Sequence, residues 1–340
     1  MNDYKCVQCG IPFQIYTNGY LFIETELNVT SDLFQNIGAN CWVAPYEKLE
    51  YAEYLLKKLE ESHLQFGREI RSALSQTKVK PLLFIPAESL LMQLQNAEII
   101  STIQTGELIS YLQPIIHLQE NDRIFGYESL LRSSCADMIS PGKLFSVAAK
   151  SGMLSLLDQR AREAAIIAKR TYVPKGVKSF INFLPSTIYN PEYCLRHTFK
   201  LVKKYEIDPS DLVFEVVETE KISDVDHLKR VLDTYKKQGM KVALDDVGSG
   251  FATLDVLQML NPDFVKIDRH YVDHCDKFPE KQQFLTEVMQ IAKDLGIIVL
   301  AEGIERPEEL EHCRQIGIDL AQGFLIGRPS ERPAKDIILI

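Results

Sequence analysis

Long apolar runs, cysteine and positive charge are all scarce in this 340-residue chain. No apolar run approaches the roughly 20 residues that a membrane-spanning helix needs, and no signal-peptide core is visible, so a cytoplasmic location is expected. The seven cysteines are an odd number and are spread thinly along the chain, which argues against a disulfide framework and for reduced thiols. A net charge of −9 argues against binding of duplex nucleic acid, which requires a positive surface. Of the broad classes of protein considered, a compact globular protein is the one that these features leave.

The first hundred or so residues differ in pattern from the rest. Strand-like runs occur at Gly19–Glu24 and Cys41–Ala44, and helical patterns at Glu47–His63 and Glu88–Ile103. These patterns predict a smaller α+β domain over residues 1–105, whose role the sequence does not assign. It could be a regulatory or interaction module for an unknown partner.

One motif in this region, Cys6-Val7-Gln8-Cys9, raises the question of zinc. A structural zinc site needs four ligands, normally in two close pairs. Cys41 and His63 do not form a second pair of that spacing, and His63 fits the apolar face of its helix. Ordinary thiols are therefore the favoured interpretation of Cys6 and Cys9, with zinc binding or a redox pair as alternatives.

From about residue 107, apolar strand-like runs alternate with amphipathic helical patterns, which indicates a mostly parallel sheet with helices outside. An α/β fold follows, with a modified TIM-type (β/α)8 barrel over residues 106–340 as the best match to the number of units. A doubly wound open sheet is the alternative, although the absence of Gly-x-Gly-x-x-Gly after a strand weakens a dinucleotide-binding interpretation. The predicted strands are Ile124–Ser129, Lys178–Phe183, Leu212–Val217, Lys241–Asp246, Asp263–Asp268, Ile297–Glu302 and Asp319–Phe324.

Polar residues recur late in these strands, where an α/β barrel gathers them at one mouth. They are Glu128, Asn182, Glu215, Asp245, Asp246, Lys266, Asp268, Glu302 and Gln322. Buried singly, each charge would carry a desolvation cost of several kcal/mol. If these side chains instead lie together at one mouth, their oxygen atoms favour binding of Mg²⁺ or Mn²⁺ over structural zinc. An ordinary solvated turn could explain Asp245-Asp246 alone, and a plain charge partner could explain Lys266.

Oxygen ligands beside a lysine suit metal-assisted phosphodiester hydrolysis. Two metal ions can hold the attacking and leaving oxygens in line and activate water near neutral pH. They would also offset the repulsion between an acidic protein and an anionic substrate.

An ordered set of motifs over about residues 107–332 resembles the EAL domains, the bacterial cyclic di-GMP phosphodiesterases. The signature Glu-Ala-Leu is present as Glu-Ser-Leu. The matching stretches are Gln113-Pro114-Ile115, Glu128-Ser129-Leu130-Leu131-Arg132, Asn182, Glu215-Val216-Val217-Glu218, Asp245-Asp246-Val247-Gly248-Ser249-Gly250, Lys266-Ile267-Asp268, Glu302-Gly303-Ile304-Glu305, Gln322-Gly323-Phe324 and Gly327-Arg328-Pro329.

The resemblance implies hydrolysis of cyclic di-GMP to linear pGpG, with two Mg²⁺ or Mn²⁺ ions at the carboxyl-terminal mouth of the barrel. It implies catalytic roles for Glu128, Lys266, Glu302 and Asp246, and a loop-bracing role for Glu218. The implied metal ligands are Glu128, Asn182, Glu215, Asp245 and Asp246. The implied substrate-binding residues are Gln113, Arg132 and Gln322. A homodimer through the barrel is also implied.

The chain departs from the family pattern without losing an implied metal ligand. Val247 replaces a usual Phe, Val217 a usual Thr, Leu184 a frequent Ser and Ser129 the usual Ala. Val247 and Val217 flank the bracing loop, so they bear on turnover more than on ligand binding. The alternative function is a catalytically weak or inactive barrel that acts as a cyclic di-GMP receptor or protein-interaction module.

Overall fold

The computed structural model describes residues 15–27, 29, 32–38, 40–62, 70–134, 138–217, 224–247 and 254–333, with the backbone only at residues 246, 247, 254 and 255. The chain divides into two compact units. The first unit comprises Met1–Glu107 and Ser133–Leu157, and the barrel unit comprises Leu108–Arg132 and Asp158–Ile340. Within the described ranges, no helix is long and apolar enough to cross a bilayer.

The first unit contains a five-stranded antiparallel sheet in the order β2-β3-β1-β4-β5. Its strands are β1 (Gly19–Glu24), β2 (Gln35–Gly38), β3 (Cys41–Tyr46), β4 (Arg71–Ser75) and β5 (Ile85–Pro86). Its helices are α1 (Leu49–Ser62), α3 (Ala87–Gln95), α4 (Ala97–Gln104) and α5 (Pro141–Lys150). Phe22, Leu55 and Leu90 are fully buried in its core, so apolar burial of the sheet against α1 and α3 stabilises this unit.

The helical segment predicted near Glu88–Ile103 is present, but it is divided into two helices that meet at Asn96. The backbone of Asn96 leaves the helical region, with φ −125° and ψ 38°. Its side-chain Nδ2 donates to the carbonyl oxygen of Met92 at 3.0 Å. Asparagine side chains compete in this way with the helical backbone ladder, which explains the break.

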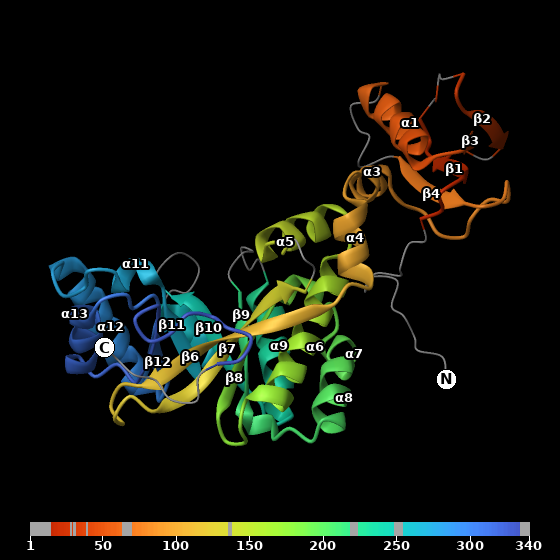
Figure 1. Ribbon diagram of the computed structural model, residues 1–340. Coiled ribbons are helices and arrows are strands. Elements are labelled where there is room, and N and C mark those ends of the chain that lie inside the picture. Colours follow the sequence, from red (N-terminus) through yellow and green to blue (C-terminus); the bar gives the residue numbers. More distant parts are fainter. Residues whose placement is uncertain are drawn as a thin grey trace. The chain divides into compact units, whose positions relative to one another are not determined.

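The barrel unit is a closed sheet of eight strands in the order β10-β11-β12-β13-β6-β7-β8-β9 (Figure 1). The strands are β6 (Leu108–His117), β7 (Ile124–Ser133), β8 (Lys178–Phe183), β9 (Leu212–Val216), β10 (Lys241–Val247), β11 (Phe264–Ile267), β12 (Ile298–Ala301) and β13 (Leu320–Gln322). All seven predicted strands of this region are present, with ends shifted by up to four residues. The α/β barrel expected from the alternation is therefore confirmed.

Strand β6 was missing from the prediction and is also the strand that breaks the parallel pattern. It pairs antiparallel with β13, with Ile115 opposite Gln322 and His117 opposite Leu320. Pro114 lies within it, and a proline inside an apolar run argues against a central strand. The pairing of Leu112 with Ser330 extends this seam between the first and last parts of the barrel.

Helices cover the outside of the barrel (Figure 1). They are α6 (Leu154–Tyr172), α7 (Pro191–Cys194), α8 (Arg196–Lys204), α9 (Val225–Lys237), α10 (Leu254–Leu260), α11 (Arg269–Val272), α12 (Pro279–Leu295) and α13 (Pro307–Gln315). One face of α9 is apolar and buried, since Leu228, Val231, Leu232 and Tyr235 are all at most 1% exposed. Burial of these outer faces against the sheet leaves the inner faces of the strands to form the site.

Candidate active site

The inside of the barrel has an apolar layer and, next to it, a polar one. The apolar layer comprises Ile115, Phe180, Val213, Ala243, Phe264, Leu300 and Leu320. Side chains alternate between the faces of a strand, so residues two apart point to the same side. Two residues after the apolar ones, on the parallel strands β8 to β13, come Asn182, Glu215, Asp245, Lys266, Glu302 and Gln322. On the reversed β6 the polar residue is instead two residues earlier, at Gln113.

Lys266 stands at the centre of the polar layer and is only 1% exposed. Its Nζ donates to Glu215 Oε2 and lies 2.6 Å from Glu302 Oε1 and 3.1 Å from Asp245 Oδ1. Glu128 Oε1 is 3.7 Å away. Three carboxylates from three strands, and a fourth from the residue that follows β12, therefore converge on one ammonium group. The structure thus brings together most of the residues that the sequence predicted for the site.

The protonation of this cluster reflects its burial and its excess of negative charge. Burial raises the pKa of Glu215 well above its ordinary value. Burial, partly offset by the ammonium group of Lys266, raises the pKa of Glu302 to about 8. Burial alone would lower the pKa of Lys266, but the surrounding carboxylates hold it well above the usual range. One lysine therefore does not balance the cluster, which favours binding of a further cation.

Glu128 is held by two carboxamides. Its Oε1 accepts a hydrogen bond from Asn182 Nδ2 at 3.1 Å and its Oε2 accepts one from Gln322 Nε2 at 2.8 Å. Burial opposes ionisation of this side chain, but Lys266 and the two amides outweigh it and lower the pKa of Glu128. Glu128 is therefore an ionised carboxylate with a fixed orientation. Gln113, from the neighbouring strand, donates to the carbonyl oxygen of Gly327 at 3.2 Å.

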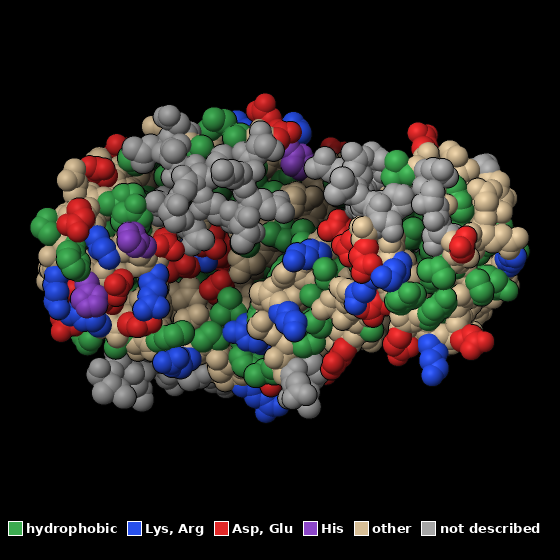
Figure 2. All heavy atoms as spheres, turned by 90° about the horizontal axis from the view of Figure 1, so that it is seen from above, with side chains coloured by type: hydrophobic (Ala, Val, Ile, Leu, Met, Phe, Trp, Pro, Cys, Tyr) green, Lys and Arg blue, Asp and Glu red, His purple; other side chains and the backbone are tan. Residues whose placement is uncertain are grey.

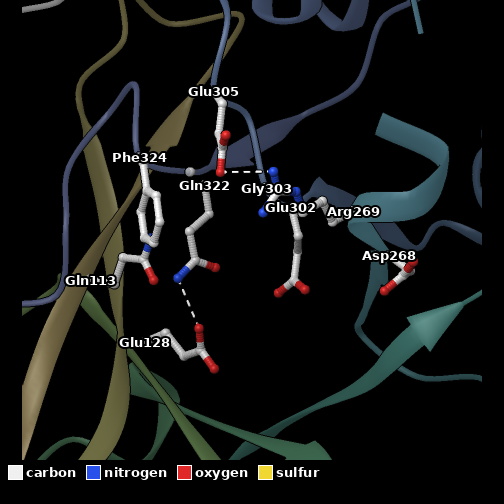
Figure 3. A pocket seen from close by; sticks show the side chains of 10 residues that line it. Gln113, Glu128, Asp268, Arg269, Glu302, Gly303, Glu305, Gln322 and Phe324 are labelled. Atoms are coloured by element: carbon white, nitrogen blue, oxygen red, sulfur yellow. Dashed lines mark hydrogen bonds and ion pairs between the residues drawn. The ribbon is translucent and has the colours of Figure 1, made fainter. Parts of the chain in front are cut away.

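A pocket of about 230 Å³ adjoins the cluster. Figure 3 shows the carboxyl groups of Glu128 and Glu302 directed into it. On the face drawn in Figure 2, acidic side chains gather around a hollow. The lining residues are Gln113, Glu128, Asp268, Arg269, Glu302, Gly303, Glu305, Gln322, Gly323 and Phe324. A ligand in this pocket would contact the carboxylates directly.

Two cationic side chains lie at or beside the pocket wall. Arg269 Nη2 is 2.9 Å from Glu305 Oε1, a pair that Figure 3 shows beside Glu302. Gly303 has a φ of 71°, and a Cβ there would lie 2.4 Å from Arg269 Cγ, so glycine permits this close approach. The guanidinium of Arg328 lies 4.1 Å from the centroid of the Phe324 ring. These groups give the pocket positive charge and an aromatic surface near its acidic floor.

Sequence reasoning assigned no role to several of these lining residues. Glu305 and Phe324 were part of recognised motifs, and Asp268 was noted at a strand end, but Arg269 carried no signal beyond its position after Asp268. In the structure Asp268 directly follows β11 and caps α11, and its Oδ1 accepts a hydrogen bond from the backbone N–H of His270 at 2.7 Å. Proximity to a strand end was therefore the one signal that could have identified Arg269.

The remaining predicted residues fall into two groups. Arg132 is half-buried, donates from Nη1 to the carbonyl oxygen of Leu131 at 2.7 Å and lies 5.3 Å from the Tyr111 ring centroid. Among the described interactions none joins Arg132 to the carboxylates. The predictions for Glu218, Cys6, Cys9, His63 and the side chains of Asp246 and Val247 lie outside the described residues.

The donor set fits a divalent metal ion. Glu215 Oε1 and Gln322 Oε1 are buried oxygen atoms that, within the described part of the chain, have no hydrogen-bond partner. Buried polar atoms are nearly always satisfied, so unpaired oxygens beside an anionic cluster indicate room for a cation. Carboxylate and carboxamide oxygens are the ligands that hard divalent ions prefer.

Comparison with known proteins agrees with this geometry. The family model for the EAL domain matches residues 93–329. The probable cyclic di-GMP phosphodiesterase PdeG of Escherichia coli (strain K12) is 32% identical over 237 residues, which cover 67% of this chain and 45% of PdeG. The structure of a standalone EAL protein from Vibrio cholerae O395, in its c-di-GMP-bound form, is 30% identical with a TM-score of 0.61, covering 69% of this chain and 97% of that one.

The Bacillus subtilis YkuI protein, solved with c-di-GMP and calcium, is 25% identical with a TM-score of 0.60, covering 70% of this chain and 59% of YkuI. The chain thus spans less than half the length of PdeG but nearly all of the standalone Vibrio structure. The family-model match covers well over half of the 340 residues. Through its barrel unit, this chain belongs to the EAL domain family.

Proposed function

We propose that the barrel unit hydrolyses cyclic di-GMP to linear pGpG with Mg²⁺ or Mn²⁺. The observation that carries the proposal is the convergence of Glu128, Glu215, Asp245 and Glu302 on Lys266 beside a pocket. Relatives named as cyclic di-GMP phosphodiesterases and a related structure with the bound dinucleotide support the choice of substrate.

Two metal ions would be held by Glu128, Asn182, Glu215, Asp245 and Asp246. Glu215 Oε1, which has no hydrogen-bond partner among the described residues, supports this assignment. When bound, such ions would supply Lewis-acid activation of water and neutralise the phosphodiester charge. Because two carboxamides already fix the orientation of Glu128, this carboxylate would not need to reorient when a metal ion binds.

One side chain of the site is placed to accept the proton that the attacking water releases. Water attacks one phosphorus atom, the bond from that phosphorus to the ribose 3′ oxygen breaks, and the ring opens to linear pGpG, which carries a 5′ phosphate and a free 3′ hydroxyl. Glu302 faces the pocket and, in its ionised form, is placed to accept a proton from the attacking water, while the leaving 3′ oxygen takes up a proton from solvent. Lys266 holds Glu302 at 2.6 Å and favours negative charge there. Gln113, Arg132 and Gln322 would bind the substrate, with Glu218 bracing the loop after Asp246.

The direct test is a product assay with purified protein, cyclic di-GMP and either Mn²⁺ or Mg²⁺. We expect pGpG to accumulate by chromatography as cyclic di-GMP disappears, and an excess of chelator to stop the reaction. Cyclic di-AMP is the matched substrate control. Binding of cyclic di-GMP without any product, under every divalent metal tried, would instead establish the receptor function.

Divalent metal is expected to stabilise the protein against heat, because ions bound only by the folded site shift the unfolding equilibrium. An ion present at a hundred times its Kd adds about 2.7 kcal/mol. Differential scanning calorimetry with and without Mn²⁺ measures the shift. The shift should vanish in Glu215→Gln and persist in Glu311→Gln, which removes an exposed carboxylate. Equal shifts in both variants would place the metal elsewhere.

The family also makes a homodimer through the barrel the expected assembly, and we propose a regulatory role for the first unit. Both proposals concern the whole protein rather than the site. Light scattering across a concentration series would measure the molar mass and so test the homodimer.

A further inference from the structure

A second buried charge network lies at the end of strand β8. Asp158, on α6, is 2% exposed. Its Oδ1 accepts from the backbone N–H of Leu184 at 3.0 Å, and its Oδ2 accepts from Thr187 Oγ1 at 2.8 Å and Arg162 Nη2 at 3.0 Å. Arg162 is itself 4% exposed and donates from Nη1 to Thr198 Oγ1 at 2.7 Å. One carboxylate therefore joins helix α6 to the turn that follows β8.

This turn directly follows a residue of the candidate active site. Asn182 is two residues before Leu184, and its carboxamide donates to Glu128 Oε1 at 3.1 Å. Leu184 to Thr187 forms a tight turn closed by a hydrogen bond from the Thr187 N–H to the Leu184 carbonyl oxygen at 3.1 Å. A carboxylate that fixes both ends of the turn restricts the path of the backbone just after Asn182.

Stability alone explains this network poorly. Burying an ion pair costs desolvation that its attraction often does not repay, so apolar residues of similar volume are commonly as stabilising. Three donors on one buried carboxylate do, however, define a geometry closely. The arrangement is therefore better explained by the precision it gives to the end of β8.

We propose that Asp158 is a positioning residue of the phosphodiesterase site: by holding Leu184 and Thr187, it sets the end of β8 and thereby the orientation of Asn182 towards Glu128 and metal. The inference rests on the proposed function, because Asn182 is a metal ligand only in that context. Asp158 does not touch the reacting atoms. Its effect passes through the backbone, as the effects of groups that orient metal ligands do.

The same helix supplies a matched control at its other end. Lys169 lies near the end of α6 and is 3% exposed, with its Nζ 3.1 Å from Asp211 Oδ2. Asp211 is also 3% exposed and accepts from the backbone N–H of Gly176 at 2.8 Å. Asp158→Asn and Asp211→Asn thus each remove one buried charge that is paired with a cation of α6. Asp211 precedes β9 and so lies at the opposite end of that strand from Glu215, and its partners Lys169, Lys178 and Gly176 are not predicted ligands.

The test measures Mn²⁺ affinity by isothermal titration calorimetry without substrate, together with thermal unfolding and the kcat and KM for cyclic di-GMP. We expect both variants to lose thermal stability. Only Asp158→Asn should bind Mn²⁺ more weakly, by about 10–100-fold, as for other groups that orient metal ligands. Its kcat should fall at saturating metal, with KM for cyclic di-GMP changing less.

If Asp158→Asn does not fold, a pair of milder substitutions tests the same positioning role. Thr187→Val removes the hydroxyl that donates to Asp158, and Thr198→Val removes the hydroxyl that accepts from Arg162. Both are buried changes of equal volume, and weaker Mn²⁺ binding is expected for Thr187→Val alone.

The outcomes separate this inference from the proposed function. Equal Mn²⁺ affinity in Asp158→Asn and Asp211→Asn, or in the two threonine variants, overturns the positioning role. Mn²⁺ binding by the wild type without pGpG formation overturns the proposed function but leaves the variant comparison decisive. A wild type that binds no Mn²⁺ overturns both.

Discussion

Glu128→Ala is expected to abolish turnover, reducing kcat by at least about 10²-fold, the usual cost of removing one electrostatic group from an active site. The change removes a proposed metal ligand that faces the pocket. It also leaves the carboxamides of Asn182 and Gln322 without the carboxylate that they bind. Steady-state rates of pGpG formation measure the effect.

The neighbouring residue provides the control for this prediction. Ser129 lies on the opposite face of β7, where its Oγ is 3.3 Å from Ser179 Oγ. Ser129→Ala restores the usual family residue and should leave the rate within a few-fold of wild type. A normal rate in Glu128→Ala would remove Glu128 from the catalytic machinery, whatever the control shows.

Lys266→Met should abolish activity and, in metal-free buffer, cost about 3–5 kcal/mol of unfolding free energy, as breaking a buried ion pair does. Methionine fills a similar volume but leaves Glu215, Asp245 and Glu302 without their shared cation. A divalent ion can supply that missing positive charge. Mn²⁺ should therefore restore more stability to Lys266→Met than it adds to the wild type.

Lys169→Met distinguishes this effect from the general cost of losing a buried lysine. Lys169 is 3% exposed and pairs with Asp211 outside the site. Urea denaturation of both variants, with and without Mn²⁺, should show similar losses but an excess metal rescue in Lys266→Met alone. An equal response to Mn²⁺ in the two variants would mean that Lys266 does not share its carboxylates with metal.

The candidate site was predictable from sequence because its geometry is periodic. Polar residues late in successive apolar strands, such as Glu215, Lys266 and Glu302, face inward as a direct result of the two-residue repeat. Their meeting at one mouth follows from parallel strands. The barrel topology alone is therefore sufficient to predict that these side chains lie together.

The features that escaped prediction depend on tertiary context. Asp158 and Arg162 are four residues apart on a helix, a spacing typical of exposed ion pairs, and only the surrounding helices reveal that both are buried. Strand β6 was missed because Pro114 weakens its strand signal. Asn96 separates α3 from α4 through a side-chain hydrogen bond that propensities do not specify.

The seam between β6 and β13 links formation of the pocket to the end of folding. Gln322 reaches Glu128 across 194 residues of sequence, and Gln113 reaches Gly327 across 214. Contacts of such long range form slowly, because the chain loses loop entropy before they are made. The pocket can therefore be complete only after the last strand has closed the barrel. A chain still being synthesised at residue 320 would contain every carboxylate of the cluster but would lack Gln322, Gly323 and Phe324, which line the pocket.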